Sequence, residues 1–200
     1  MKKIIRIIAI VMLTASFTAC EELAQIANQA AQVMNLKNCT FDVNGISNIN
    51  MLGINVSNGM NKNNLTAAQL INVTNSLLSK KLPVTFNVNI DVNNPNSIAA
   101  SLGKMDYIIS LNNKEVISSC FTEGFSINPN SQGKIAIPIS TDLFQLFSSE
   151  TADAILNLAF KLAGAKSDPV NLGVKVKPYI KVNNQSLAYP DYITINKVLN

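Results

Sequence analysis

The clearest pattern along the chain is a strict alternation of apolar and polar residues over residues 82–93. Alternate side chains of a strand point to opposite faces, so a period of two predicts a strand with one buried face. Residues 94–96 end it, because proline lacks an N–H for sheet pairing and asparagine favours turns. The buried row of this strand would be Val84, Phe86, Val88, Ile90 and Val92.

Shorter alternations predict further strands on both sides of this segment. Short strands repeated with turns between them favour an antiparallel β-sandwich, here of roughly seven strands with one or two inserted helices. In the order of the chain, the further segments are residues 41–43, 49–51, 54–56, 105–111, 116–121, 135–139, 172–182 and 192–195.

Turn-forming and proline residues refine three of these strands. Asn112-Asn113 predicts a tight hairpin turn, because asparagine tolerates positive φ. Pro138 indicates a strand at a sheet edge or a bulge, and Pro178 is expected to interrupt the long strand near the C-terminus.

Helical spacing appears in three segments. Residues 21–36 carry a mostly alanine apolar face, and residues 142–162 are mainly helical, with Gly164 as a stop. Thr66 and Gln69 match a capping box that begins a helix over residues 67–78. The core face of that helix would be Leu70, Val73 and Leu77, flanked by Ile71 and Leu78.

The first twenty residues have the order of a secretory signal. A basic start is followed by an apolar run over residues 7–13, which is shorter than the roughly 20 residues that a membrane-spanning helix needs. Small residues then precede Cys20, and this arrangement resembles the bacterial lipobox. In that class of signal the cysteine thiol receives a diacylglyceryl group and cleavage makes the cysteine the first residue. The alternative is an ordinary secretory signal with a chance cysteine.

This arrangement predicts the domain organisation and the location of the protein. We expect residues 1–19 to be a signal peptide, residues 20–36 a lipidated N-terminus and tether, and residues 37–200 a single domain. Acyl chains at Cys20, palmitate among them, would anchor the protein in the cell envelope at the outer membrane, facing the periplasm or exposed on the surface. Glu21-Glu22 resembles a surface-export signal, or it begins the next helix, where acids are favoured.

Composition adds little about partners. The net charge of +4 falls to +1 without residues 1–19, which hold three basic residues and no acid, so the basic balance does not indicate nucleic acid. The chain has 28 asparagines, whose amides could contact glycans or hold water, or could simply reflect an AT-rich genome.

The residue types present argue against an enzyme. Without histidine the chain cannot form the Ser-His-Asp and Cys-His arrangements, and it lacks the nitrogen ligand of most zinc sites. The acids Asp142, Glu150 and Asp153 lie near a helix start, where the helix dipole explains them. We therefore predict no catalytic residue, no metal site and no cofactor.

Two cysteines remain besides Cys20. Cys39 and Cys120 could form a disulfide that closes a loop of about 80 residues and contributes about 4 kcal/mol. They could equally be two buried free thiols, which are common in protein cores. The sequence leaves both alternatives open.

Residues 88–96 read Val-Asn-Ile-Asp-Val-Asn-Asn-Pro-Asn and resemble the late embryogenesis abundant type 2 family, also called the WHy domain. Members carry an alternating strand that ends in Asn-Pro-Asn, and residues 105–109 and 134–139 follow in the same order. The resemblance covers residues 82–142. It implies an immunoglobulin- or fibronectin-like β-sandwich with one helix, a role in desiccation or stress protection, and no agreed active site. Asn94, Pro95 and Asn96 would then close a structural turn.

These inferences together predict a non-enzymatic, membrane-anchored lipoprotein of this family. It would protect against stress or desiccation, or bind a protein or glycan partner in the envelope. The alternative is a carrier that holds a hydrophobic ligand between the sheets and the 142–162 helix. That segment contains Phe144, Phe147 and Phe160.

Overall fold

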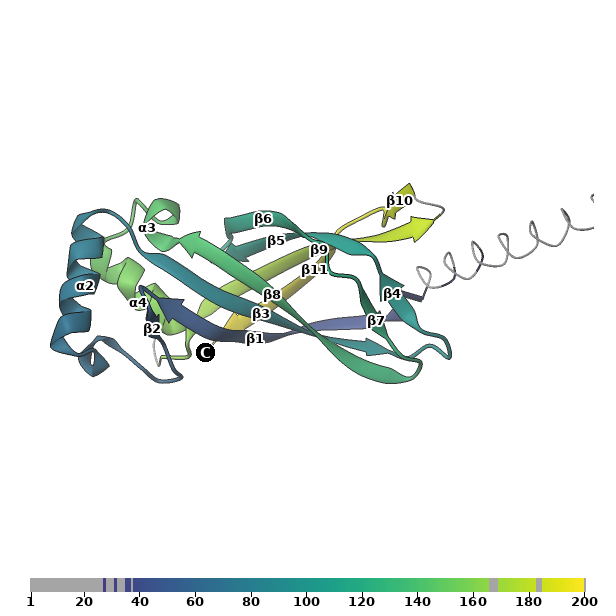
Figure 1. Cartoon of the computed structure of the whole chain (residues 1–200), viewed down its shortest axis with the longest axis horizontal. Helices are drawn as coiled ribbons and strands as arrows, with labels where there is room; N and C mark the ends of the chain where they lie inside the picture. The colour runs from purple at the N-terminus through teal and green to yellow at the C-terminus, as the bar shows by residue number, and fades with distance from the viewer. Residues whose placement is uncertain are drawn as a thin grey trace, which may run out of the picture.

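Antiparallel strands dominate the computed structural model (Figure 1), which describes residues 27, 31, 35, 36, 38–165, 169–182 and 185–199. The strands are β1 Thr40–Met51, β2 Ile54–Asn55, β3 Pro83–Asn94, β4 Ala100–Leu102, β5 Lys104–Leu111, β6 Lys114–Phe121, β7 Phe125–Ile127, β8 Ser131–Asp142, β9 Val170–Val182, β10 Gln185–Ala188 and β11 Ile193–Leu199. The helical elements are the short η1 Lys62–Asn64, α2 Ala67–Leu78, α3 Leu143–Leu146 and α4 Ala152–Leu162.

The strands form two large sheets and one small one. The first has the order β2-β1-β3-β8. In the second, β9 lies between β5 on one side and both β10 and β11 on the other, with β6 outside β5. Strands β4 and β7 pair separately. All described pairings are antiparallel, so the prediction of a mainly β, antiparallel protein is confirmed.

The buried faces of the two large sheets share one apolar cluster. In β3 every second residue from Val84 to Asn94 is buried, which confirms the alternation expected there. Strand β11 lies beside β1, and β6 lies beside β8, so the edges of the two sheets approach each other. The largest fully buried side chains are Phe86, Leu36, Met51, Leu82, Ile90, Met105, Ile109, Leu111, Ile137, Ile139, Leu143 and Ile155.

The segment before residue 56 differs from the prediction of several short strands. Residues 40–51 form a single strand, β1, whose pairing with β3 shifts between Val43 and Gly45 and again between Ser47 and Asn50. Gly45 and Asn48 have φ values of 132° and 54° there. Such bulges absorb residues that break the period of two, so one strand can contain an irregular pattern.

Two prolines show how position in the sheet decides their effect. Pro138 lies in the edge strand β8, as predicted. Pro178 was expected to interrupt its strand, but β9 continues through it. The backbone of Pro178 faces the break between β10 and β11, and its carbonyl accepts from the Tyr189 N–H at 2.8 Å. No ladder partner is lost there, because neither strand pairs with Pro178.

The structure confirms the predicted ends of α2 more fully than the predicted burial of its residues. The Thr66–Gln69 capping box and the bounds of α2 are confirmed. Val73 of α2 is buried and Leu77 packs half-buried against the core, as predicted, but the expected core position of Leu70 is wrong, because 42% of its surface is exposed. The predicted 142–162 helix is two helices, α3 and α4, with a break between them.

The N-terminal predictions lie mainly outside the described residues. Of the expected 21–36 helix, the described residues Ala27, Ala31, Asn35 and Leu36 are helical, and Leu36 is buried in the core. The signal peptide, Cys20 and Glu21-Glu22 are not among the described residues. Of the helices that are described, none has the length and apolar character needed to cross a membrane.

Candidate functional site

Asn94 forms a buried polar junction at the end of β3. Within the described part of the chain it is the one polar or charged residue that is buried, with no exposed surface. Its amide nitrogen lies 3.0 Å from the Ile98 carbonyl, 3.2 Å from that of Ile127 and 3.0 Å from that of Asn128. Two N–H groups are thus shared among three carbonyls, which fixes the end of β3 to the segments around β4 and β7.

The side-chain oxygen of Asn94 links this junction to the residues that precede β1. Its oxygen accepts hydrogen bonds from the Asn96 backbone N–H at 3.1 Å and the Asn96 side-chain amide at 2.7 Å. The Asn96 amide also donates to the Asn35 carbonyl at 2.9 Å, and Asn38 donates to Asn96 at 3.1 Å. Both asparagines of the Asn-Pro-Asn turn are therefore engaged within the protein, and Pro95 joins them.

The two remaining cysteines are free thiols in different environments. Cys39 is buried beside Asn94, with its sulfur 3.7 Å from the Asn94 side-chain oxygen, whereas Cys120 is exposed on β6. The structure contains no Cys39–Cys120 disulfide, and only one of the two thiols is buried, so neither alternative from the sequence describes the pair. Burial raises the pKa of Cys39. Desolvation raises the pKa of Cys120, and the neighbouring Asp106 raises it further.

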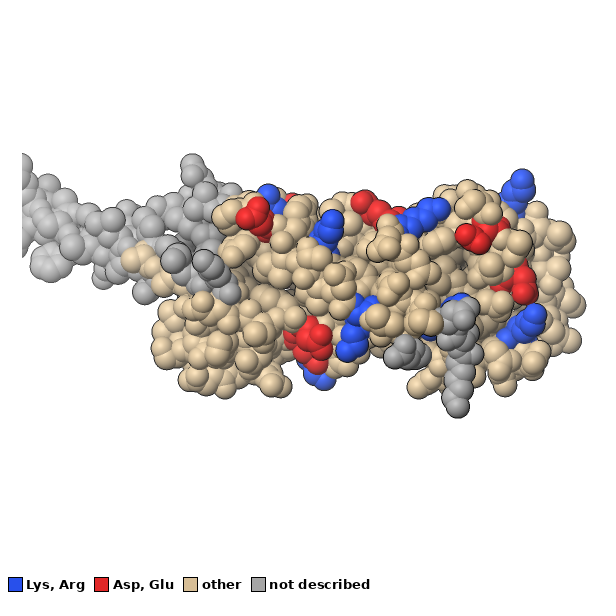
Figure 2. All heavy atoms as spheres, turned by 180° about the vertical axis from the view of Figure 1, so that it is seen from behind, with Lys and Arg blue, Asp and Glu red and all other residues tan. Residues whose placement is uncertain are grey.

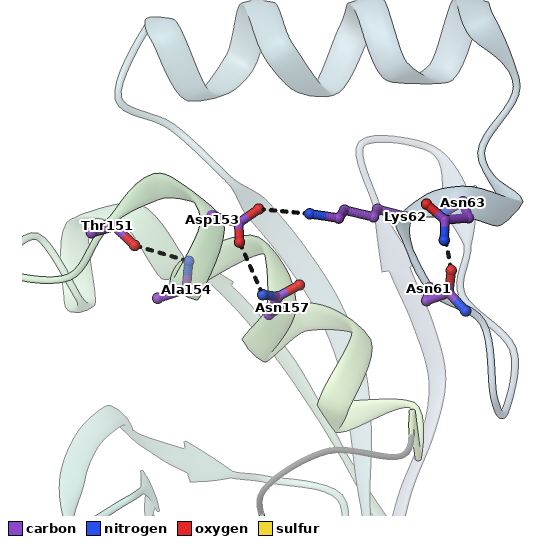
Figure 3. Close-up of polar contacts among 7 residues, drawn as sticks. All are labelled: Asn61, Lys62, Asn63, Thr151, Asp153, Ala154 and Asn157. Atoms are coloured by element: carbon purple, nitrogen blue, oxygen red, sulfur yellow. Dashed lines mark hydrogen bonds and ion pairs between the residues drawn. The ribbon is translucent and has the colours of Figure 1, made fainter.

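The acids of the 142–162 segment hold helices in place (Figure 3). Asp153 forms an ion pair with Lys62 at 3.2 Å and accepts from the Asn157 amide at 3.3 Å. Asp142 caps α3 by accepting from the Phe144 backbone N–H at 2.9 Å, and it also accepts from the Leu82 backbone N–H at 2.8 Å. This use agrees with acids placed for helix ends. Among the described residues, no group of three or more potential ligand residues is arranged to hold a metal ion.

A cluster on the outer face of the second sheet was not foreseen. The Tyr179 hydroxyl donates a hydrogen bond to Asp106, and this bond raises the pKa of Tyr179. The Lys104 ammonium lies 4.3 Å from the centre of the Tyr179 ring. These residues are far apart in sequence, and only the pairing of β5 with β9 brings them together. Predicting this cluster therefore requires knowing that β5 pairs with β9.

The outer face of the first sheet carries polar side chains, mostly amides but also the Asp91 carboxylate, that are linked across strands. The Asn44 amide donates to Asp91 at 2.7 Å, and the Asn89 amide donates to Ser47 at 2.9 Å, both between β1 and β3. Asn87 lies in the same half-exposed row of β3. The polar half of the alternation in β3 therefore forms an amide-rich surface.

Two solvent-open grooves lie beside α4. One, of about 390 Å³, is lined by Phe147, Ile155 and Leu158 together with Lys114 and Glu150. The other, of about 470 Å³, lies between β1, β11 and the end of α4. Phe147 and Phe160 pack into the core, with 8% and 2% of their surface exposed. This arrangement differs from the enclosed apolar cavity between the sheets that a hydrophobic carrier needs.

Comparison with known proteins identifies a family. A family profile described as "Late embryogenesis abundant protein" matches residues 89–188, which is half of the chain. No curated protein matches. A crystal structure of a protein from Archaeoglobus fulgidus is 12% identical, with a TM-score of 0.34 over 58% of this chain and 83% of that chain. A solution structure of a protein from Arabidopsis thaliana is also 12% identical, with a TM-score of 0.40 over 60% of this chain and 70% of that one.

The profile match extends from β3, through the Asn-Pro-Asn turn and the second sheet, to β10. It includes the Asn-Pro-Asn turn and residues 105–109 and 134–139. The chain belongs to the late embryogenesis abundant type 2 family.

Proposed function

We propose that this protein is a non-enzymatic, lipid-anchored protein of the cell envelope that protects other macromolecules during stress or desiccation. Cys20 would carry the lipid at the outer membrane, and the folded domain would act through its surface. The observation that carries the proposal is the amide-rich outer face of the β2-β1-β3-β8 sheet. Envelope proteins or glycans would be the surfaces it contacts.

Physical chemistry supports this use of the amide-rich face. Each asparagine amide offers two donors and one acceptor oxygen, so it can replace water at hydroxyl, peptide or sugar groups without selecting a charge. Asn87, Asn89 and Asn93 lie on one half-exposed row of β3. The buried Asn94, by contrast, uses its amide within the protein.

The finer fold is part of the proposal. We infer an immunoglobulin- or fibronectin-like β-sandwich, supported by two antiparallel sheets whose apolar faces share one core. A rigid sandwich would keep the amide-rich face flat and available.

A drying assay tests the protective role. A labile enzyme is dried and rehydrated with the wild-type chain, with N87A/N89A/N93A, or with the control S118A/T194A/N196A on exposed positions of the other sheet. We expect the first variant to lose protection and the control to keep it, with thermal unfolding used to confirm that both are folded. Equal protection by both variants and by an unrelated β-sandwich of equal mass would contradict the proposal.

Palmitate labelling tests the anchor separately. Cells expressing the full chain should incorporate labelled palmitate, and C20S should not. Label that is absent from the wild-type chain, or retained by C20S, would exclude the lipid at Cys20.

A further inference from the structure

Helix α2 exposes its more apolar face to solvent. Leu70, Ile71 and Leu78 have 42%, 61% and 77% of their surface exposed. Residues four or seven positions apart lie on one face of a helix. Leu78 is seven positions after Ile71 and two steps of four after Leu70, so the three side chains lie on the same side. We call Leu70, Ile71 and Leu78 the α2 stripe.

The inward face of α2 is less apolar than the α2 stripe. It contributes the fully buried Val73 and the half-buried Leu77, but also the polar Gln69 and Ser76. Gln69 completes the capping box and the Ser76 hydroxyl donates to the Lys81 carbonyl at 2.7 Å. The side chains of the α2 stripe therefore remain exposed although α2 packs on the domain. Exposed clusters of this kind mark interaction surfaces.

The charges around the α2 stripe have one sign in the sequence. Helix α2 itself has no charged residue, and no acid occurs anywhere between Asp42 and Asp91. Lys80 and Lys81 follow the helix and are exposed. Lys62 precedes it and is the one lysine of the three whose charge is paired in a described ion pair, with Asp153.

The position of α2 suits a flat surface. Figure 1 shows α2 at one end of an elongated molecule, with its axis running across that end and the start of β1 at the other end. Figure 2 shows the same end, now on the right, from behind, where basic and acidic side chains lie among uncharged ones. Neither groove described above includes a residue of α2. A convex helix lying across a tip can place its whole length on a plane.

We propose that the α2 stripe docks onto an anionic lipid surface. Leu70, Ile71 and Leu78 would enter the boundary between headgroups and acyl chains, while Lys80 and Lys81 would contact acidic headgroups. Lysine suits this position, because its long apolar stem can lie along the boundary while the ammonium reaches the headgroups. The docking surface is at the opposite end of the molecule from the start of β1 (Figure 1).

Charge favours this occupant over a second copy of the chain. In a symmetric contact, the α2 helix of a second copy would offer no acid to Lys80 and Lys81, because α2 contains none. An anionic membrane offers negative charge to Lys80 and Lys81, and its plane suits the convex stripe.

A single introduced tryptophan tests the proposal, because the chain has none of its own. The full chain carrying L78W is mixed with vesicles of phosphatidylglycerol and phosphatidylcholine, or of phosphatidylcholine alone, with brominated acyl chains as quenchers. We expect a blue shift and quenching with the anionic vesicles only. The control V198W places tryptophan at a residue of β11 that is 50% exposed, and it should show neither change.

Charge and apolar variants then separate the two contributions. Adding K80Q/K81Q to L78W should weaken vesicle binding about tenfold or more, since each lysine near an anionic surface contributes on the order of 1 kcal/mol. Adding L70S/I71S should weaken it at least as much. Because the tryptophan reports α2 alone, binding of vesicles through the N-terminal residues leaves this readout unchanged.

Three results would overturn the proposal. An unchanged L78W spectrum with anionic vesicles excludes the lipid surface. A blue shift that grows with protein concentration in the absence of vesicles indicates a second copy instead. A spectrum already blue-shifted at high dilution indicates that the chain itself covers the α2 stripe. Palmitate labelling of Cys20 is unaffected by any of these results, so the two proposals can fail independently.

Discussion

The two ends of the molecule reverse the usual placement of polar and apolar residues. At one end the polar Asn94 is completely buried and its amide makes five hydrogen bonds of 3.2 Å or less. At the other end Leu78 of α2 has 77% of its surface in solvent. Both departures lie at the margins of a core that otherwise follows the alternation of its strands (Figure 1).

The difference shows that residue type alone does not indicate what a position does. A buried amide is stabilising only when its donors and acceptor are satisfied, so Asn94 has a structural role. An exposed leucine contributes little to folding and is available to a partner. We therefore expect mutations at the Asn94 end to change stability and mutations at the α2 stripe to change binding.

The largest effect should come from Asn94. Replacing it with alanine leaves the Ile98, Ile127 and Asn128 carbonyls without this donor in a buried site, and each unsatisfied group costs about 1–3 kcal/mol. We expect N94A to lower the free energy of unfolding by about 3 kcal/mol or more in urea titrations. The adjacent N93A, on the half-exposed row, should lose less than about 1 kcal/mol. Similar losses for both would show that the buried network is not the source of stability.

The second effect compares two residues of α2. Val73 is 2% exposed, so V73A should cost about 1–2 kcal/mol through lost burial and a small cavity. L78N on the α2 stripe should stay within about 0.5 kcal/mol of the wild type. Thermal and urea unfolding of the two variants measure this directly. A larger loss for L78N would mean that the stripe packs on something within the protein.

The two thiols allow the reactivity of a buried and an exposed position to be compared directly. Alkylation without reductant, followed by peptide mapping, should label Cys120 quickly in the native protein and Cys39 only after unfolding. Failure to label either one in denaturant without reductant would instead reveal a disulfide.

The same buried thiol predicts a pH dependence of stability. Burial raises the pKa of Cys39 above that of the unfolded chain, so the folded state favours the neutral thiol. Its contribution is fully present below the unfolded pKa and declines as pH rises through the folded pKa. Urea unfolding at increasing alkaline pH should therefore show a steeper loss of stability for the wild type than for C39A. Parallel curves would remove Cys39 as a cause.

The smallest effect should come from the ion pair that joins the segment before α2 to α4. Both side chains of Lys62–Asp153 are more than half exposed, at 53% and 64%. Exposed pairs contribute about 0–1 kcal/mol, so D153N should change stability by no more than that. The difference between wild type and D153N should shrink further in high salt, because salt screens exposed charges. A loss that persists in high salt would assign Asp153 a different role, such as its contact with Asn157.

Local patterns predicted the elements whose causes are local. The alternation of β3, the capping box of α2 and the positive φ of Asn112 and Asn113 are properties of neighbouring residues, and all are observed. The family was also recognisable from a short strand and its turn.

Other features depend on residues that meet only in the folded chain. The bulges of β1 arise from its pairing with β3, and the tolerance of Pro178 arises from the break between β10 and β11. The Asp106–Tyr179 contact requires the pairing of β5 with β9. No local pattern contains this information, because each contact joins distant parts of the sequence.

Residue patterns alone were enough to establish that this protein is mainly β, that Thr66 caps the start of α2, and that the chain belongs to the late embryogenesis abundant type 2 family. Which faces of these elements are covered depends on long-range packing. The spacing of α2 specifies an apolar stripe but not the direction in which it points, because that direction depends on how the helix packs on the rest of the domain. The same packing placed Asn94 in the interior, where its amide found partners in the turn that follows it, at Asn96 and Ile98, and in the distant segment at Ile127 and Asn128.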